Sequence, residues 1–496
     1  MGTCSLEPFR PIIRLLPEVR RPARMPTLNQ KLLWTVAGLV LFFVMYHIYP
    51  IGVVRIASQQ AEFMQIIFAS KVGSLITAGI GPIVLASIFL QLFAGAKLIN
   101  VDMRDPDHKA LFSGTQKLLA ILLSFFESGV YVWTGGVPVM GMLGSGYEPI
   151  ISLLFTQILV TFQLAMGSII LLYMDEVIAK YGIGSGISLF IAAGVSLAVV
   201  QGTLGLEGQG LLPSAMNAIN EGGSDAIPNA ILAFLPLLFT FVVFAASVYA
   251  EGMKVEIPLA FERARGFGGR FPIKFLYVSN LPVILASALL LNVRLWARLF
   301  HDKVFYLGGV NIFQTLAVTD ATGYPIGGLI YLLTPSSFPN PLFVGGYRVY
   351  IDYLLTRSTE LVLPFIGVLM VPEVVHIAIY VMFYTLLCVM FGRFWIETTG
   401  MDSRSVAEQL QKSGLQVPGY RRDPRIIERV LDRYIPTITI LGSAFVGLLA
   451  AFADLTGALG TGTGILLTVG ILYKIYEQLT TERMFELYPD LRKFIS

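Results

Sequence analysis

Residues 55–95 read RIASQQAEFMQIIFASKVGSLITAGIGPIVLASIFLQLFAG and contain the second apolar run of the chain. The first part mixes glutamines and charged residues with phenylalanine and isoleucine, so it is too polar to face lipid and too apolar for a solvated loop. The second part is interrupted by Gly79, Gly81 and Pro82. Inside a membrane, irregular backbone survives only where protein or a water-filled cavity surrounds it. The pattern predicts a half-inserted helix inside the protein, followed by a full span over 73–95 that lines the same cavity.

Composition places the whole chain in a membrane. Hydrophobic residues make up 55% of the 496 residues and charged residues 14%. Apolar runs near the roughly 20 residues needed to cross a bilayer recur along the chain. They lack the period-two alternation of membrane barrels. We predict an all-α polytopic membrane protein with ten spans, near residues 32–51, 73–95, 112–134, 150–173, 185–201, 229–250, 273–293, 373–396, 436–453 and 462–481.

The placement of lysine and arginine predicts that both termini are cytoplasmic. The segments that would lie inside hold most of these residues, whereas the short outer loops 134–149, 202–228 and 454–461 hold none. Two inner loops, 251–274 and 397–434, are too long and too charged for simple turns. Their charge fits either anchoring of the helices or docking of a large anionic partner such as ribosomal RNA. The outer segment 294–372 is expected to form a folded external hairpin or cap.

The span count suggests an internal duplication. Five spans lie on each side of loop 202–228, which gives an N-terminal half over 1–201 and a C-terminal half over 202–496. Because five is odd, the two halves are expected to have inverted orientations, as in many transport proteins.

No motif in the chain points to catalysis. The glycine-rich pieces GIGSG (182–186) and GTGTG (460–464) lack the Lys-Ser/Thr of a phosphate-binding loop, so close helix packing is the expected role. Glu373 and His376 are spaced like one arm of a carboxylate metal site, but such sites need a second pair. We expect no enzyme activity, no cofactor and no metal.

A few polar residues lie inside predicted spans. Glu127 is in the third span, where a carboxylate is costly unless it faces a cavity or a polar partner. Gln91, Ser279 and Asn280 lie in spans two and seven. These residues are expected to form a weak polar seam between helices.

Several long motifs together resemble the SecY family, the main subunit of protein-conducting channels, and are nearer to its archaeal and eukaryotic branch than to its bacterial one. They are LITAGIGPIVLASIFLQLFAG, YGIGSGISLFIAAGVS, VEIPLAFERARGFGGRFPIKFLYVSNLPVILASAL, FWIETTGMD and GALGTGTGILLTVGILYKIYEQL. The resemblance runs from about Pro26 to the C-terminus and is weakest over 202–228 and 294–360. It implies a ten-span clamshell of two pseudo-symmetric inverted halves with an hourglass pore.

The resemblance also implies functional segments. It implies a short plug helix over about 56–72, with the residues Arg55, Gln59, Glu62, Phe63, Ile67 and Lys71. It implies a hydrophobic pore ring formed by Ile80, Val84, Ile183, Ile187, Ile284 and Leu466. A lateral gate between spans two and three and spans seven and eight would carry Ser87, Gln91, Glu127, Ser279 and Asn280. Many relatives have glutamine at the position of Glu127, so a glutamate there is a departure of this chain from the family pattern. The ribosome-docking residues would be Arg263, Arg265, Arg421 and Arg422.

The function expected from this resemblance is a passive, gated channel in the plasma membrane. It would conduct unfolded secretory polypeptides and release transmembrane segments into lipid. Its partners would be the ribosome, signal sequences and nascent chains, membrane lipid, and small membrane subunits of the SecE/gamma and beta types. A secondary transporter is the alternative, but it needs a midplane ion or substrate site, for which the sequence offers only Glu127. A third possibility, a membrane-embedded hydrolase, is not supported, because the sequence shows no paired HExxH, serine–histidine or aspartate-dyad motif.

Overall fold

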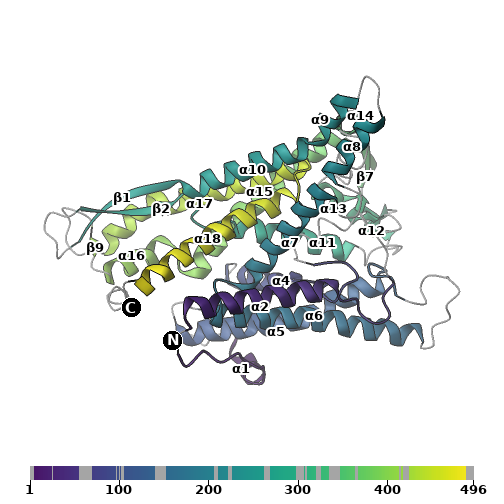
Figure 1. Cartoon of the computed structure of the whole chain (residues 1–496). Helices are drawn as coiled ribbons and strands as arrows, with labels where there is room; N and C mark the ends of the chain where they lie inside the picture. The colour runs from purple at the N-terminus through teal and green to yellow at the C-terminus, as the bar shows by residue number, and fades with distance from the viewer. Residues whose placement is uncertain are drawn as a thin grey trace.

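The computed structural model of the chain describes residues 5–24, 26–54, 70–95, 98–99, 101, 105–139, 152–205, 210–221, 226–261, 268–297, 306–307, 310–319, 325–334, 347–363, 367–412, 415–416 and 424–487. These residues form mainly long helices (Figure 1).

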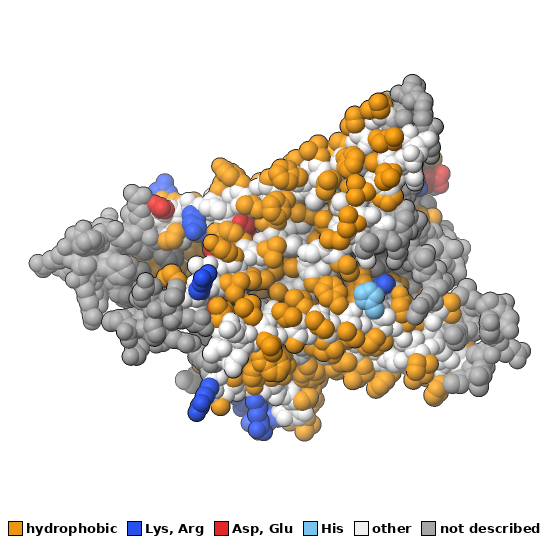
Figure 2. Space-filling model, viewed as in Figure 1, with side chains coloured by type: hydrophobic (Ala, Val, Ile, Leu, Met, Phe, Trp, Pro, Cys, Tyr) orange, Lys and Arg blue, Asp and Glu red, His pale blue; other side chains and the backbone are white. Residues whose placement is uncertain are grey.

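Each of the ten predicted spans overlaps a helix of the structure. The ten helices are α2 (Leu28–His47), α4 (Gly81–Gly95), α5 (Pro106–Trp133), α6 (Leu153–Tyr181), α7 (Gly186–Leu204), α10 (Leu235–Gly252), α11 (Leu281–Ala297), α15 (Glu373–Thr399), α17 (Pro424–Leu455) and α18 (Gly462–Leu487). Among the described residues, 7 helices are long and apolar enough to cross a membrane, and α4 and α11 are shorter apolar helices. Hydrophobic side chains cover much of the long helices in Figure 2. The predicted all-α polytopic membrane fold is confirmed.

Several predicted span boundaries were wrong, most clearly the starts of the second, seventh and ninth spans. The seventh was predicted from residue 273, but residues 273–274 belong to β2 (Gly268–Lys274) and α11 starts only at Leu281. The second span is helical only from Gly81, because the backbone before it forms turns with positive φ at Gly73 (85°) and Gly79 (53°). Thr77 stabilises these turns: its Oγ1 accepts from the Gly73 N–H (3.0 Å) and donates to the Ser74 carbonyl (2.6 Å). The ninth span belongs to a helix that starts at Pro424 and continues through Pro436, because the helix extends beyond its apolar part. The half-inserted helix expected before the second span lies almost wholly outside the described residues.

Short helices and strands occupy the loops and the N-terminal segment. The N-terminal segment contains η1 (Glu7–Phe9) and α1 (Arg10–Ile13), and α8 (Leu211–Glu221) and α9 (Ala226–Ala233) precede α10. The described parts of the predicted external cap are β3 (Tyr306–Leu307), β4 (Val310–Asn311), α12 (Ile312–Leu316), β5 (Val318–Thr319), β6 (Pro325–Gly327), α13 (Leu329–Leu332), α14 (Tyr347–Thr356), β7 (Ser358–Leu363) and β8 (Gly367–Pro372). The strands pair as the antiparallel hairpins β3–β4, β5–β6 and β7–β8. The sequence-based prediction of a hairpin or cap did not specify how many strands the segment contains.

A small sheet joins the two basic loops. The strand β1 (Lys254–Phe261) pairs antiparallel with β2 (Gly268–Lys274), and its end pairs with β9 (Leu415–Gln416), where Phe261 lies opposite Leu415. The helix α16 (Ser403–Lys412) lies beside this sheet, and a hydrophobic cluster that includes Ile257, Ile273, Ile396, Leu410 and Leu431 packs beneath it. The two basic loops, which are far apart in the sequence, therefore form one folded unit with α16.

The long helices form two groups (Figure 1). The helices α2, α4, α5, α6 and α7 form one group and α10, α11, α15, α17 and α18 form the other, and α4, α7 and α11 lie where the two groups face each other. Contact between the groups is made by α4 with α11 and α15, and by α7 with α18. The Nζ atom of Lys31 lies 2.6 Å from the Oε1 atom of Glu482, so the start of α2 and the end of α18 meet at one end of the molecule.

The two glycine-rich turns have similar structures, and their predicted role in close packing is confirmed. A Cβ atom at Gly186 would lie 2.7 Å from the Cα of Asp175, and one at Gly462 would lie 2.1 Å from the Cβ of Ala453. In the first turn, Asp175 on α6 accepts from the backbone N–H of Ile187 on α7 (2.9 Å). In the second, Asp454 on α17 accepts from the N–H of Gly462 on α18 (2.9 Å).

Candidate functional site

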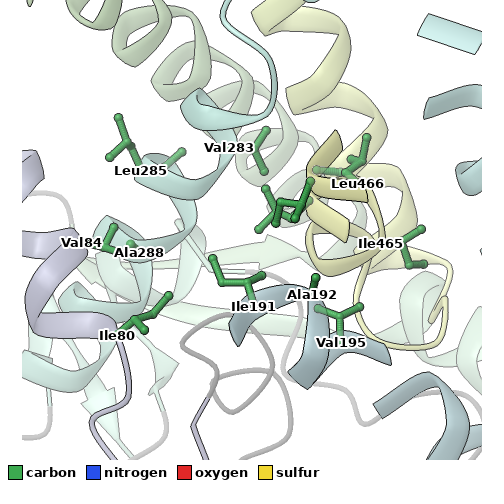
Figure 3. Close-up of a cluster of buried hydrophobic side chains, with 14 of the residues drawn as sticks. Ile80, Val84, Ile191, Ala192, Val195, Val283, Leu285, Ala288, Ile465 and Leu466 are labelled. Atoms are coloured by element: carbon green, nitrogen blue, oxygen red, sulfur yellow. The ribbon is translucent and has the colours of Figure 1, made fainter. Parts of the chain in front are cut away.

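A buried apolar cluster lies where the two groups of helices meet. Side chains from α4 and the turn before it, α7, α11 and α18 converge there (Figure 3). The labelled members are Ile80, Val84, Ile191, Ala192, Val195, Val283, Leu285, Ala288, Ile465 and Leu466. The cluster is thus built from residues of both predicted halves, and its side chains are largely branched aliphatic.

The spacing of residues along α7 explains its contribution to this cluster. Ile187, Ile191 and Val195 are four residues apart, which places them on one face of a helix. Gly460, next to α18, lets the chains approach, because a Cβ there would lie 3.3 Å from Cγ1 of Val195. The sequence analysis missed Ile191 and Val195, although their helical spacing from Ile187 was a signal that could have identified them.

The structure places most of the predicted ring residues together. Ile80, Val84 and Leu466 belong to the cluster and are 0%, 7% and 0% exposed. Ile187 and Ile284 are partly buried and pack against it. Ile183 is buried but is not a member of the cluster. Its backbone N–H donates to Oγ1 of Thr35 on α2 (3.0 Å).

A second contact between the groups runs along α4. The rings of Phe89 on α4 and Trp296 on α11 stack with centroids 6.3 Å apart and planes 12° apart. At the end of α4, a Cβ on Gly95 would lie 2.7 Å from the ring of Phe394 on α15. The interface predicted to be a lateral gate is therefore closely packed, with aromatic side chains on both sides.

The polar residues predicted for this gate make separate contacts. Gln91 Nε2 donates to Ser87 Oγ (2.9 Å), and both residues are on α4. Ser279, which has a positive φ of 56°, donates from Oγ to Glu251 Oε1 (3.4 Å). Within the described part of the chain, no hydrogen bond joins either pair to Glu127.

Asn280 connects α11 to the ring. Its Nδ2 donates to the backbone carbonyl of Leu466 on α18 (2.6 Å), and the side chain is 4% exposed. Gly470 makes room for it, because a Cβ at that position would lie 2.0 Å from Nδ2 of Asn280. The start of α11 is thereby tied to the backbone of a predicted ring residue.

Glu127 is buried in α5 without a polar partner among the described residues. Its side chain is 0% exposed, and neither carboxylate oxygen accepts a hydrogen bond there. A buried carboxyl group with no partner is destabilising, because its lost hydration is not replaced. The polar partner expected from the sequence is not found within the described ranges.

Of the predicted plug residues, only Lys71 is within the described structure. Arg55, Gln59, Glu62, Phe63 and Ile67 lie outside the described residues. The Lys71 Nζ atom lies 5.1 Å from the ring centroid of Tyr46 and 5.8 Å from that of Tyr49. These contacts fix the chain before α4 to the end of α2.

The four predicted docking arginines, Arg263, Arg265, Arg421 and Arg422, also lie outside the described residues. The first two belong to the connection between β1 and β2, and the other two follow β9. Because β1 pairs with both β2 and β9, the sheet brings the strands that carry these connections together.

Glu373 and His376 form a buried contact between the cap and α15. Nδ1 of His376 lies 2.9 Å from Oε1 of Glu373, and Nε2 lies 2.9 Å from the carbonyl of Thr334. The hydroxyl of Tyr331 on α13 donates to Oε2 of Glu373 (3.0 Å). Both ring nitrogens therefore contact protein atoms. Among the residues that the structure describes, no group of three or more His, Cys, Asp or Glu side chains could hold a metal ion.

These features define a polytopic helical membrane protein whose two groups of helices meet at a buried apolar cluster. The SecY family model matches residues 74–476, and the chain belongs to the SecY family. The predicted resemblance is confirmed.

Similarity to known proteins covers nearly the whole chain. The chain is 40% identical over 493 residues to the protein translocase subunit SecY of Methanococcus vannielii, covering 98% of this chain and 99% of that one. A solved SecY structure, in which the plug domain is described as stabilising the closed state of the translocation channel and maintaining a membrane seal, is 40% identical and has a TM-score of 0.75. That match covers 97% of this chain and 98% of the other. Sec61 in the canine ribosome–channel complex from the endoplasmic reticulum is 39% identical with a TM-score of 0.73, over 97% and 98% of the two chains.

Proposed function

We propose that this protein is the central pore-forming subunit of a protein-translocation channel. The observation that carries the proposal is the apolar cluster of α4, α7, α11 and α18 at the contact between the two groups of helices. A ring of branched aliphatic side chains forms a constriction that excludes water and ions by dewetting. Because these side chains come from separate helices, they can move apart around a polypeptide. The function is also supported by the similar proteins, one named protein translocase subunit SecY and the other described as part of a translocation channel.

The segment over about 56–72 is proposed to be the plug that closes the channel on its outer side. The similar SecY structure supports this assignment, because closed-state stabilisation and membrane sealing are ascribed to a plug domain in that protein. Lys71, held at Tyr46 in the last turn of α2 and at Tyr49 just after it, would form the fixed end of this segment.

The interface of α4 and α5 with α11 and α15 is proposed to be the lateral gate, with Ser87, Gln91, Glu127, Ser279 and Asn280 at or near it. A signal helix would open the gate by moving its apolar residues into lipid. At a few tenths of a kcal/mol for each Leu or Ile, roughly ten such residues would supply several kcal/mol. This amount exceeds the approximately 1–3 kcal/mol that is typical of coupling between sites. The ribosome or another partner would supply the driving force for transport.

The two halves, 1–201 and 202–496, are proposed to be inverted copies of one unit. The support is the equivalent position of the two glycine-rich turns, each joining the last two spans of its half and each with an aspartate that binds the N-terminus of the next helix. The first turn lies near Thr35 in the N-terminal half of α2. The second lies near Val199 at the far end of α7, so the two turns are at opposite ends of the molecule.

The partners proposed for this subunit follow from its basic loops and its family. Arg263, Arg265, Arg421 and Arg422 are proposed to dock the ribosome, in line with the similarity to Sec61 in a ribosome–channel complex. Signal sequences, nascent chains, lipid and small subunits of the SecE/gamma and beta types would complete the assembly. We propose that the protein lies in the plasma membrane. Both termini would be in the cytoplasm, because the positive-inside pattern predicts this orientation.

Site-specific crosslinking tests the proposed pore. A photoreactive amino acid is placed at Ile187 or at Leu466, and ribosomes carrying a stalled secretory chain are added to membranes that contain the protein. Both positions should crosslink to the chain inside the channel. The control position is Leu441 on α17, whose side chain is 55% exposed on the outside of the bundle. Crosslinks at Leu441 but at neither cluster position would contradict the proposal.

A further inference from the structure

The N-terminal segment packs against one end of the helix bundle. Leu6, just before η1, is 4% exposed and lies in a cluster with Leu90, Leu111 and Phe112. At the last residue of α1 the contact is equally close, because a Cβ at Gly114 on α5 would lie 2.4 Å from Cγ2 of Ile13. The segment therefore has a fixed position beside α5, at the start of the predicted span 112–134.

The chain after α1 is fastened to α5 and α6 by hydrogen bonds. Lys117 Nζ donates to the carbonyl of Pro17 (2.6 Å). The N–H of Val19 donates to Oε1 of Glu176 (3.2 Å), and the hydroxyl of Tyr181 donates to the carbonyl of Arg20 (2.9 Å). These bonds hold the segment where the spans emerge, at the end of the molecule that also contains the contact between Lys31 and Glu482.

Apolar side chains of this segment point away from the bundle. Phe9, Ile12 and Leu15 are 41%, 47% and 83% exposed. The helix α5, against which the segment packs, also carries exposed apolar side chains, with Leu122 59% and Phe126 47% exposed. Because α5 is one of the helices long enough to span the membrane, the segment lies next to a helix with a lipid-facing apolar surface.

Basic side chains lie next to these apolar ones. Residues 5–24 contain five arginines and two glutamates, and both glutamates are paired: Glu7 with Arg10 (3.6 Å) and Glu18 with Lys180 (3.1 Å). Within the described residues, the remaining arginines make no ion pair; they are Arg14, Arg20, Arg21 and Arg24. Basic and hydrophobic side chains are neighbours in Figure 2 at the corner of the molecule that α1 occupies in Figure 1.

We propose that residues 5–24 bind the surface of an anionic lipid bilayer. Phe9, Ile12 and Leu15 would enter the boundary between headgroups and acyl chains, as the apolar face of an interfacial helix does. The arginines that follow would bind lipid phosphates, which attract clustered basic residues next to a membrane span. The segment thereby anchors the start of α2 at the membrane surface. This role is separate from the proposed pore and does not depend on it.

Spin labelling of the full-length protein in nanodiscs tests the position of the apolar residues. The labelled site is Leu15→Cys in a Cys4→Ser background, and the native Cys388 is left in place because it is 0% exposed. The reference sites are Leu122→Cys on the apolar face of α5 and Arg429→Cys on the exposed part of α17. We expect the label at Leu15 to be accessible to oxygen and shielded from a water-soluble nickel chelate, with an accessibility ratio near that of Leu122 and several-fold above that of Arg429.

A lipid-selectivity measurement tests the role of the arginines. Spin-labelled phosphatidylglycerol and phosphatidylcholine report which lipid is retained next to the protein. The variant Arg14→Gln/Arg21→Gln/Arg24→Gln should lower the preference for phosphatidylglycerol at least twofold. The matched control is Arg404→Gln/Arg429→Gln/Arg433→Gln, which removes the same charge from α16 and α17 and should leave the preference unchanged.

Three results would overturn the proposal. The first is a label at Leu15 that the nickel chelate reaches as readily as at Arg429, which would place the segment in water. The second is shielding of Leu15 only after a small single-span membrane protein is added, which would make this face a protein interface. The third is equal lipid selectivity of the triple variant and its matched control, which would exclude lipid headgroups as the ligand of the arginines.

Discussion

At the scale of single residues, Gly462 is a position that accepts no larger side chain. A Cβ there would lie 2.1 Å from the Cβ of Ala453, so Gly462→Ala forces α17 and α18 apart. Overpacking of this kind costs about 1–3 kcal/mol. We expect a lower midpoint of thermal unfolding for the purified variant.

Gly252→Ala is the matched control for this substitution. Gly252 is also at a helix end, and a Cβ there would have nothing within 4 Å. Alanine is favoured over glycine in a helix by up to about 1 kcal/mol, so the control should be neutral or slightly more stable. Equal destabilisation by both substitutions would show that the close packing at Gly462 is not the cause.

Glu127 gives a second prediction at this scale. Replacing it by glutamine keeps the shape of the side chain and removes a carboxyl group that has no partner among the described residues. Because burying an ionisable carboxyl group without a partner is destabilising, Glu127→Gln should raise the midpoint of thermal unfolding. The exposed Glu397→Gln serves as the control and should have little effect. A loss of stability in Glu127→Gln would mean that the carboxylate has a partner that glutamine cannot replace.

At the scale of elements, each of the ten predicted spans overlaps a helix, because apolar runs of about span length are recognisable from the sequence without any structure. The start of α4 was not predictable in this way. The turns before it depend on hydrogen bonds with hydroxyl groups, such as the one that the backbone N–H of Gly73 donates to Oγ1 of Thr77. The pairing of β1 with β9 joins loops that are distant in the sequence, and no local pattern reports it.

The candidate site was predictable only in part. Family motifs selected Ile80, Val84 and Leu466, and these residues do lie in one buried cluster. Residue type alone could not have distinguished them from other aliphatic residues in spans. The position of Ile183 beside Thr35, outside the cluster, depends on the path of the turn between α6 and α7.

The contact between α4 and α11 gives a prediction for the gate. The stacked rings of Phe89 and Trp296 connect the two groups of helices, and an aromatic pair contributes about 0.5–1.5 kcal/mol beyond its buried area. Phe89→Ala should therefore ease gate opening. We expect a roughly two- to tenfold higher ratio of integrated to translocated product for a marginally apolar transmembrane segment.

Phe125→Ala is the control for this gate variant. Phe125 is on α5, is 38% exposed and contacts Phe162 of α6, which belongs to the same group of helices. It should leave the ratio of integrated to translocated product unchanged. If Phe89→Ala also left this ratio unchanged, the contact between α4 and α11 would not limit gate opening.

At the scale of the whole molecule, the sheet of β1, β2 and β9 makes the two basic loops one surface. Ribosome binding should therefore weaken in Arg263→Gln/Arg265→Gln and in Arg421→Gln/Arg422→Gln. Because each lost contact to a phosphate reduces the number of counterions released on binding, the dependence of affinity on salt should also become less steep. Co-sedimentation with ribosomes at several salt concentrations measures both effects.

The control for ribosome docking is Arg357→Gln, which lies in the external cap between α14 and β7. This variant should bind ribosomes like the unmodified protein at every salt concentration. Unchanged binding by both loop variants would show that these loops do not dock the ribosome. Their charge would then serve only to anchor the helices in the membrane.

The most direct test of the channel is ion conductance of the purified protein in planar bilayers, with and without residues 57–70. We expect the intact protein to conduct little, because the apolar ring and the plug close it. The deletion variant should conduct ions without any solute gradient. If both proteins stayed silent, or if flux required the gradient of a specific solute, the plugged-channel account would be contradicted and a secondary transporter would be favoured.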